Sequence, residues 1–356
     1  MAKFSEVLTI VNGRNQKQVV CDDGKYPIYG SGGIMGYAND YICKAETVVI
    51  GRKGSINKPI FVETPFWNVD TAFGLYANSE KLNPKYLYYF CEKFDFEKLN
   101  TTVTIPSLTK SNLLNVEIPL PNLEKQKQIV ELLDKVTRLI FLRKQQLAKL
   151  DELVKARFVE MFGECSSIRP QKLKEVTRRV KVGFVGTCEK YYTDNTGVPM
   201  LRTTNITSHG IDLKDLKYVT KTFHEKNLKS QVHKGDLLIA RHGSNGQANV
   251  YYGDEAQCLN AIIIEPDSNI TNPIFLVNLI NSRRVKRQIE KELVGSTQHV
   301  LNTTTLANVE VEIPAIKDQQ AFAAFVERVD QQKRAVQQSL EKLELMKKAL
   351  MQEYFG

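Results

Sequence analysis

The chain has 356 residues, of which 42% are hydrophobic and 25% charged, a balance typical of an ordered globular protein with room for two domains. No apolar run reaches the length of a membrane span and the N-terminus lacks a signal-peptide core, so we expect a cytoplasmic protein with no membrane partner. The six cysteines are scattered, which argues against a disulfide framework or zinc site, and the net charge of +9 is compatible with a polyanionic partner without identifying one.

Residues 1–81 alternate short apolar runs with turn residues, which predicts a β-rich, curled sheet. A helix rich in Tyr and Phe is expected over 84–99, with Asn83 as its N-cap and Pro84 in its first turn. Trp67, the only tryptophan, is expected in the core rather than stacked on a base. The runs that we expect to form strands are 26–29, 47–50, 60–62 and 72–76.

The segment 122–163 is predicted to form one long coiled-coil helix, because two columns of a seven-residue repeat are mostly apolar. An ordinary core helix is the alternative, which the length of the segment disfavours. The columns are Leu133, Ile140, Leu147, Val154, Met161 and Ile129, Val136, Arg143, Leu150, Arg157.

The region after this helix repeats the same scheme. We expect a second strand-rich region, a helix from Pro273 to about Leu293, and a second long helix over 315–356. All five histidines lie in this second region, without the spacing of metal ligands. The strands are expected at 198–201, 237–240, 249–252 and 261–264.

The second half of the chain is a copy of the first. Residues 315–356 align with 122–163 without a gap, and further upstream Arg241 aligns with Arg52. Such a long repeat indicates two copies of a whole module rather than a solenoid. Because few residues join the first long helix to the second strand-rich region, the two helices are predicted to be antiparallel. Each would span about 60 Å at about 1.5 Å per residue, so that the coil could act as a ruler.

We therefore predict an α+β fold in which two β-rich heads are separated by two long antiparallel coiled-coil helices, related by a pseudo-two-fold axis. The predicted domains are a first head over 1–120, a first long helix over 121–163, a second head over 164–314 and a second long helix over 315–356.

Catalytic motifs are missing from the sequence. The glycines at 30–36 are spaced one residue too widely for a dinucleotide fingerprint, and Asn272-Pro-Ile-Phe275 lacks the second proline of an adenine methyltransferase motif. No phosphate-binding Gly-x-x-x-x-Gly-Lys loop is present. We therefore predict a non-catalytic chain with no metal and no cofactor of its own, and disfavour a self-contained nuclease or methyltransferase.

Polar loops follow the strands of both heads and suit binding to bases and phosphates. Arg52 and Arg241 occupy equivalent strand ends, where each could contact guanine or phosphate or could bridge the sheet; the sequence leaves both interpretations open. The candidate DNA-binding residues are Tyr29, Ser31, Arg52, Lys53, Ser55, Asn57, Lys58, Thr102, Thr104, Arg202, Thr204, Asn205, Arg241, His242, Ser244, Asn245, Gln247 and Gln298.

Two divergent heads, each followed by a near-identical long helix that closes with Phe-Gly, resemble the specificity subunit of type I restriction–modification systems. The resemblance covers essentially the whole chain, although Ile313-Pro-Ala-Ile316 lacks the second proline of the first copy. The local features that carry it are Tyr-Pro-Ile-Tyr-Gly-Ser-Gly-Gly-Ile at 26–34, Thr-Val-Val-Ile-Gly-Arg-Lys-Gly at 47–54, Asp-Leu-Leu-Ile-Ala-Arg at 236–241, and Ile-Pro-Leu-Pro at 118–121 leading into Leu-Glu-Lys-Gln at 123–126.

The resemblance implies that each head is a target-recognition domain that reads one half of a bipartite sequence in double-stranded DNA, and that the coiled coil sets the spacer. It implies two modification (methyltransferase) subunits as partners, which bind S-adenosylmethionine, and restriction (translocase) subunits that use ATP and Mg²⁺. The exposed helix faces and the Phe-Gly ends would be docking surfaces. The alternative function is a structural coiled-coil adaptor whose heads bind protein rather than DNA.

Overall fold

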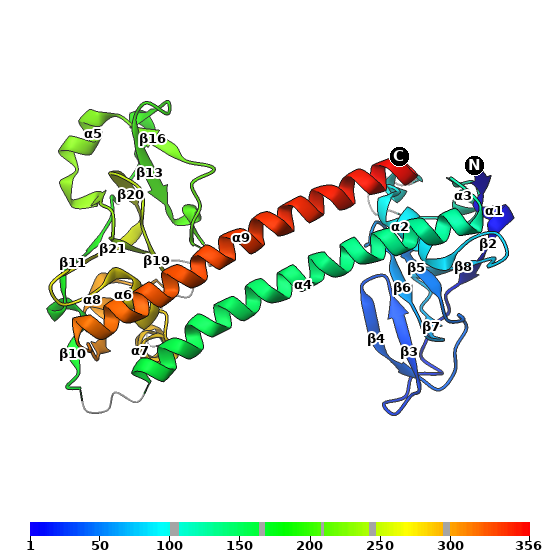
Figure 1. The fold of residues 1–356 in the computed structure, drawn as a ribbon, viewed down its shortest axis with the longest axis horizontal. Helices are drawn as coiled ribbons and strands as arrows, with labels where there is room; N and C mark the ends of the chain where they lie inside the picture. The colour runs from blue at the N-terminus through cyan, green and yellow to red at the C-terminus, as the bar shows by residue number, and fades with distance from the viewer. Residues whose placement is uncertain (100–106, 164–167, 208–209, 242–246, 295–299) are drawn as a thin grey trace. The chain divides into compact units, whose positions relative to one another are not determined.

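The computed structural model describes residues 1–99, 107–163, 168–207, 210–241, 247–294 and 300–356 (Figure 1). Its contacts divide the chain into two compact units, Met1–Gln146 with Val336–Gly356, and Leu147–Ala335. Each unit thus holds one head, part of the helix α4 (Leu123–Phe162) and part of the helix α9 (Ile316–Phe355). Within the described ranges, no helix has both the length and the apolar character needed to cross a membrane.

The first head contains all four strands expected from its sequence. A short antiparallel pair holds its start against its end: β1 (Ala2–Lys3) with β9 (Glu117–Ile118). A four-stranded antiparallel sheet has the order β2 (Leu8–Asn12), β8 (Ala72–Ala77), β5 (Thr47–Gly51), β6 (Ile60–Val62). A second sheet has the order β4 (Gly33–Ala38), β3 (Tyr26–Gly30), β7 (Trp67–Asn68). The helical elements are α1 (Phe4–Val7), α2 (Pro84–Lys93), η1 (Phe96–Leu99) and α3 (Lys110–Leu114).

The second head has the same frame. Its end pair is β10 (Gln171–Lys172) with β22 (Glu310–Val311), and its first sheet has the order β11 (Thr177–Val182), β21 (Ala261–Pro266), β18 (Leu237–Ala240), β19 (Ala248–Val250). The strand expected at 249–252 therefore begins one residue earlier and ends at Val250. The helical elements of the frame are η2 (Leu173–Glu175), α6 (Pro273–Ile280), α7 (Arg283–Val294) and α8 (Thr303–Ala307).

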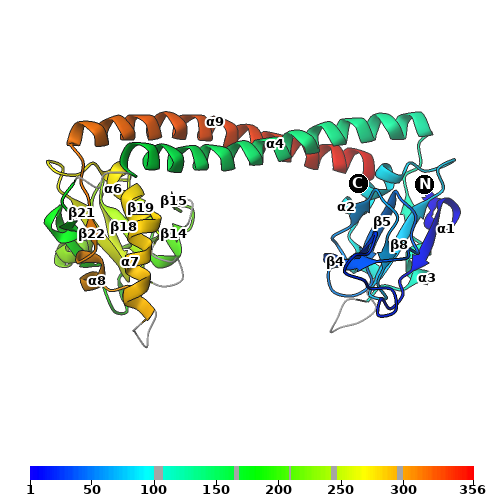
Figure 2. The same ribbon diagram turned by 90° about the horizontal axis from the view of Figure 1, so that it is seen from below.

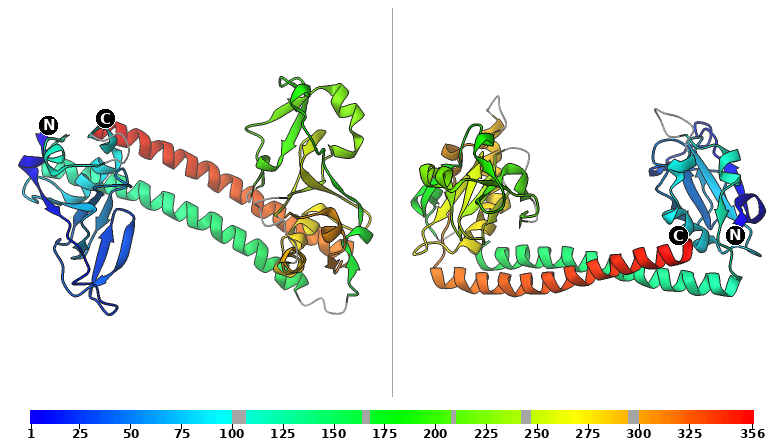
Figure 3. Two further views of the ribbon diagram at one scale, coloured as in Figure 1. Left: turned by 180° about the vertical axis from the view of Figure 1, so that it is seen from behind. Right: turned by 90° about the horizontal axis from the view of Figure 1, so that it is seen from above.

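The heads differ in the second sheet. In the second head it has five strands, β12 (Tyr192–Thr193), β16 (Lys217–Val219), β13 (Val198–Arg202), β20 (Ala256–Leu259) and β17 (Gln231–Val232). Both versions keep one parallel pair, β3 with β7 and β13 with β20. Further elements surround the larger sheet: η3 (Glu189–Tyr191), η4 (Thr203–Asn205), β14 (Ile206–Thr207), β15 (Gly210–Ile211), α5 (Lys221–Lys226) and η5 (Leu228–Ser230). Within this head, α5 and the five-stranded sheet lie at the end away from α6, α7 and α8 (Figures 1 and 3). A common frame with unlike second sheets is the pattern that the sequence repeat predicts.

The two shorter predicted helices are both interrupted. The helix expected over 84–99 ends at Lys93, because the side chain of Asn57 accepts the N–H of Phe96 at 2.7 Å and holds the next turn separately as η1. The helix expected from Pro273 to about Leu293 breaks at Asn281. The amide of that residue exchanges two hydrogen bonds of 2.9 Å with the backbone of Ala248, which anchors the end of α6 on β19.

A buried glutamine links each head to the long helix that follows it. Asn83 caps α2 as predicted, and its own N–H donates to Oε1 of Gln126 at 2.8 Å, while Nε2 of Gln126 donates to the carbonyls of Lys81 and Pro121. The second unit repeats this arrangement through Gln319, which accepts the N–H of Asn272 at 2.8 Å. Both glutamine side chains are completely buried. We call each arrangement a glutamine clamp.

The helices α4 and α9 run antiparallel within each unit, as predicted (Figures 1 and 2). In the first unit, Lys144 forms a 2.9 Å ion pair with Glu344. The ring centre of Phe355, near the end of α9, lies 4.9 Å from the ring centre of Tyr86 in the head. In the second unit, Lys333 pairs with Asp151 at 2.6 Å. Six apolar heptad residues of the two helices are buried, and two of them, Leu133 and Phe322, belong to the cores of their heads. The other four are Val136, Val329, Val336 and Leu340.

Candidate nucleic-acid interface

Arg52 lies at the end of β5 with a fixed backbone and an exposed side chain. Its N–H donates to Thr71 at 2.8 Å, and its carbonyl accepts the N–H of Leu108 at 2.9 Å. The guanidinium lies 5.8 Å from the centre of the Phe73 ring, a cation–π distance. Gly54 has φ of +76°, a left-handed conformation that favours glycine at this turn. The first head therefore presents one exposed arginine on a rigid strand end.

Arg241 occupies the same place in the second head but is held more tightly. Its carbonyl accepts the N–H of Leu301 at 3.2 Å, which repeats the pairing of Arg52 with Leu108. The side chain is half-buried, and its Nε donates to the carbonyl of Leu301 at 3.3 Å. Arg241 is thus bonded to Leu301 through both its backbone and its side chain, contacts that are compatible with the structural interpretation.

Two further candidates of the first head are Tyr29, in β3, and Ser31, in the turn that follows it. Ser31 lies in the turn between β3 and β4, and a Cβ placed on Gly51 would be 2.8 Å from its Cβ, so this turn packs closely against the end of β5. The Tyr29 ring packs edge-on against Phe66 at 5.3 Å. Burial, and then the nearby Tyr37, raise the pKa of Tyr29, so its hydroxyl remains a hydrogen-bond donor at neutral pH.

The other candidates on this side of the first head differ in exposure. Asn57 makes structural hydrogen bonds, since its Nδ2 also donates to Oδ1 of Asp95 at 2.9 Å. Lys53 and Lys58 are exposed, and Ser55 is half-buried. Arg52, Lys53 and Lys58 are thus the candidates of the first head whose positive charges are exposed to a phosphate.

In the second head, Arg202 and Asn205 are engaged with the protein itself. Nη2 of Arg202 donates to the carbonyl of Asp215 at 2.7 Å and forms an ion pair with its carboxylate at 3.1 Å. Asn205 is 3% exposed and donates to the carbonyls of Asp212 and Asp215. Thr204, between them, is exposed.

Gln247 follows the loop after Arg241 and accepts a 3.0 Å hydrogen bond from Nζ of Lys286 in α7. This bond joins α7 to the residue that precedes β19. The remaining candidates lie outside the described residues: Thr102, Thr104, His242, Ser244, Asn245 and Gln298.

Histidine and cysteine take no part in a metal site within the described ranges, where no group of three or more His, Cys, Asp or Glu side chains could hold an ion. The buried His224 instead contacts the amide of Gln257 at 3.1 Å. Burial raises the pKa of Cys43 and of Cys258 to about 12. The cysteines that the structure describes as free are Cys21, Cys43, Cys91, Cys188 and Cys258.

The basic face of α7 was not among the candidates from sequence. The sequence signal for this face is the basic run Arg283-Arg284-Val285-Lys286-Arg287. By itself the run predicts only a solvent-exposed helix, because the sequence does not show which side of the helix is buried.

Comparison with known proteins agrees with this architecture. The family model of the type I restriction modification DNA specificity domain matches residues 1–152 and 180–345. The type I restriction enzyme MjaVIII specificity subunit of Methanocaldococcus jannaschii is 24% identical over 332 residues, which cover 86% of this chain and 75% of that protein. The type I restriction enzyme EcoBI specificity subunit of Escherichia coli is 21% identical over 316 residues, 80% of this chain and 66% of that protein.

Solved structures share the fold. The S subunit of the type I restriction-modification system of M. genitalium has a TM-score of 0.64 at 15% identity, with 100% of this chain and 95% of that chain covered. A chain from a study of complex assembly and conformational transition in the type I R-M system has a TM-score of 0.59 at 16% identity, with 99% and 96% covered. With a duplicated α+β frame, antiparallel helices and a family model that matches most of its length, the chain belongs to the specificity subunits of type I restriction–modification systems.

Proposed function

We propose that this chain recognises DNA in a type I restriction–modification complex, with each head reading one half of a bipartite target. The observation that supports this most is the pairing of one frame with two different second sheets, of three and five strands. The shared frame attaches each head to its long helix in the same way, while the different second sheets and loops present different side chains to DNA. Two different half-sites follow naturally from two such heads.

We further propose that the coiled coil sets the spacer between the half-sites and that its exposed faces receive two modification subunits. In the first unit, exposed apolar side chains on α4 and α9 support a docking role, because such groups are normally covered by a partner. The repeated helices suit repeated partners. S-adenosylmethionine, ATP and Mg²⁺ would then bind to the modification and restriction subunits in the cytoplasm, while this chain remains non-catalytic. The exposed apolar residues are Leu132, Leu139, Phe141, Leu142, Leu345 and Met346.

The experiment is selection of bound duplexes from a randomised DNA library by the full chain, alone and with its modification subunits. We expect a consensus of two unlike half-sites separated by a fixed number of unspecified base pairs. A variant that lacks 140–146 of α4 and 340–346 of α9 loses two turns from each helix and keeps the heptad register. It should select the same half-sites with a different spacer; an unchanged spacer would refute the ruler.

One observation favours the alternative of a protein-binding adaptor. Strand β4 of the first head exposes Ile34 by 55%, Met35 by 64% and Tyr37 by 46%. Such an apolar strand can contact protein as well as DNA. If the library shows no enriched sequence with either preparation, the adaptor function replaces DNA recognition.

A further inference from the structure

The helix α7 begins at Arg283, which aligns with Phe94 when Asn272 is placed on Asn83. Among the described residues of the first head that align with α7, 94–99, the structure has only the short η1. The helix carries five basic and two acidic side chains, a net charge of +3, whereas the twelve aligned residues 94–105 carry one basic and two acidic side chains. The second head has therefore gained a basic surface that the common frame does not require.

One side of α7 is fixed firmly to the head. Val285 and Ile289 are 1% and 3% exposed. The amide of Gln288 exchanges two hydrogen bonds of 2.9 Å with the backbone of Glu310. Arg284 binds the carboxylate of Glu312 through both terminal nitrogens, at 2.6 and 2.7 Å. A ligand on the opposite side would therefore meet a helix that needs no further ordering.

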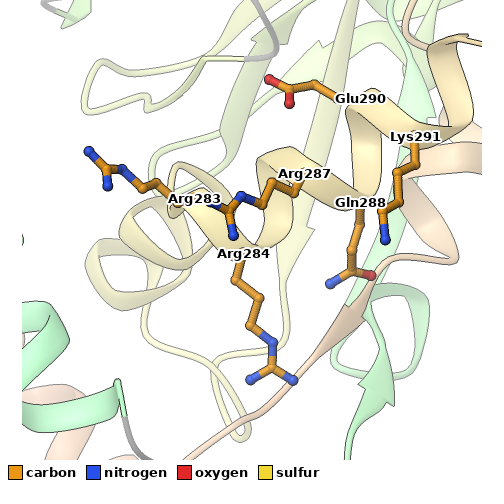
Figure 4. Close-up of a pocket in the computed structure, with 6 residues that line it drawn as sticks. All are labelled: Arg283, Arg284, Arg287, Gln288, Glu290 and Lys291. Carbon is orange, nitrogen blue, oxygen red and sulfur yellow. The ribbon is translucent and has the colours of Figure 1, made fainter.

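Two arginines remain on the outer side. Arg283 and Arg287 are exposed, one turn apart, and extend to the same side of the helix, while Arg284 points to another side (Figure 4). Glu290, one turn beyond Arg287, lies above them in this view. No carboxylate of the described residues lies within ion-pairing distance of Arg283 or Arg287. Their charges are therefore available to a partner. The hollow of about 640 Å³ beside them is bordered by Arg283, Arg284, Arg287, Gln288, Glu290 and Lys291.

Two contacts join α7 and the turn before it to a candidate residue of the second head and its neighbour. Lys286 donates to Gln247 at 3.0 Å, and Asn281, just before the helix, is bonded to Ala248. The flank of α7 that carries Lys286 therefore touches a part of the head that we propose to meet DNA.

We propose that Arg283 and Arg287 bind the phosphate backbone of duplex DNA beside the half-site of the second head. Arginine suits phosphate because its planar guanidinium donates two parallel hydrogen bonds. Two arginines one turn apart can contact two phosphates without reading any base, so they add affinity and register to this head alone. The inference depends on the proposed DNA recognition by this head.

The test compares the full chain with an Arg283→Ala/Arg287→Ala variant by fluorescence anisotropy, on the selected duplex and on an unrelated duplex, at 50–200 mM salt. Each phosphate contact contributes about 0.9 to the slope of log K against log salt, so the slope should become shallower by about 1.8. Over this fourfold range of salt, the variant should lose roughly twelvefold less affinity than the parent chain. The selected consensus should remain the same.

Two controls fix the interpretation. Arg283→Lys/Arg287→Lys keeps both charges and should keep most of the salt slope. Arg328→Ala/Arg334→Ala removes two exposed arginines from α9 within the same unit and should leave the slope unchanged. An unchanged slope in the α7 variant, or a loss confined to one half-site sequence, would overturn the proposal. If the parent chain binds both duplexes equally, the proposed sequence recognition fails instead, while the slopes still report the phosphate contact.

Discussion

Replacing Gln126 with alanine should weaken the attachment of the first head to the start of α4 and so lower the stability of the first unit. The side chain is completely buried and makes three hydrogen bonds, of 2.8 Å from Asn83, 3.0 Å to Lys81 and 2.8 Å to Pro121. Truncation leaves one N–H and two carbonyls without this partner, and an unsatisfied buried group costs about 1–3 kcal/mol. Because the carbonyls can regain water when the cavity opens, we expect the lower end of this range for each group. The free energy of unfolding should fall by about 3 kcal/mol.

Urea denaturation followed by tryptophan fluorescence would measure this loss. Trp67 is the only tryptophan of the chain and lies buried in the first head, with its indole N–H bonded to Arg14 at 3.0 Å, so its emission reports on that head. Gln128→Ala, an exposed glutamine on the same helix, is the matched control and should change stability by less than about 0.5 kcal/mol. The reasoning is refuted if both variants unfold at the same urea concentration as the parent chain.

The remaining predictions concern buried ionisable groups. In a Cys165→Ser variant at pH 8, a thiol reagent should label the half-exposed Cys21 first. The buried Cys43 and Cys258 should react more than about a hundredfold more slowly, which mass spectrometry would measure. Equal labelling rates would contradict the burial of these two thiols. Burial raises the pKa of Asp236 above its ordinary value of 3.8, so its protonated form favours folding, and this contribution is lost as the pH rises through the raised pKa. Asp236→Asn should therefore raise the melting temperature at pH 7 by a few degrees, and calorimetry should show this gain shrinking as the pH falls toward 4. A lower melting temperature at pH 7 would show instead that the carboxylate is needed to accept the N–H of His233.

The sequence was informative wherever a repeating pattern or a local cap determines structure. Period-seven columns located α4 and α9, and the Asn-Pro pairs located the starts of α2 and α6, because these signals act over a few residues. The break at Asn281 could not be predicted, since its cause is a hydrogen bond to Ala248, thirty-three positions earlier. A strand contact of this kind has no local signature.

The candidate site shows the same limit. The sequence suggests Asn57 and Asn205 as DNA-binding loop residues, yet the structure uses their amides to hold other backbone segments of the heads. Composition cannot distinguish an amide that faces solvent from one that replaces a backbone partner. The sequence does not single out Arg283 and Arg287, because only the burial of Val285 and Ile289 in the fold reveals which side of the helix faces outward.

The core of the first unit includes residues from both ends of the sequence: Met351 and Phe355 pack with Leu133, Tyr86 and Phe90. During translation, the last residues that pack into the core of the first head are therefore synthesised only after the second head has been made. At roughly 5–20 residues per second, the interval between Leu133 and Phe355 is on the order of 10–40 s. The first unit is thus synthesised first but completed last, and a premature stop in α9 after Ala335 would expose the apolar interior of the first head while the second head keeps Phe322 and Val326 in its own core.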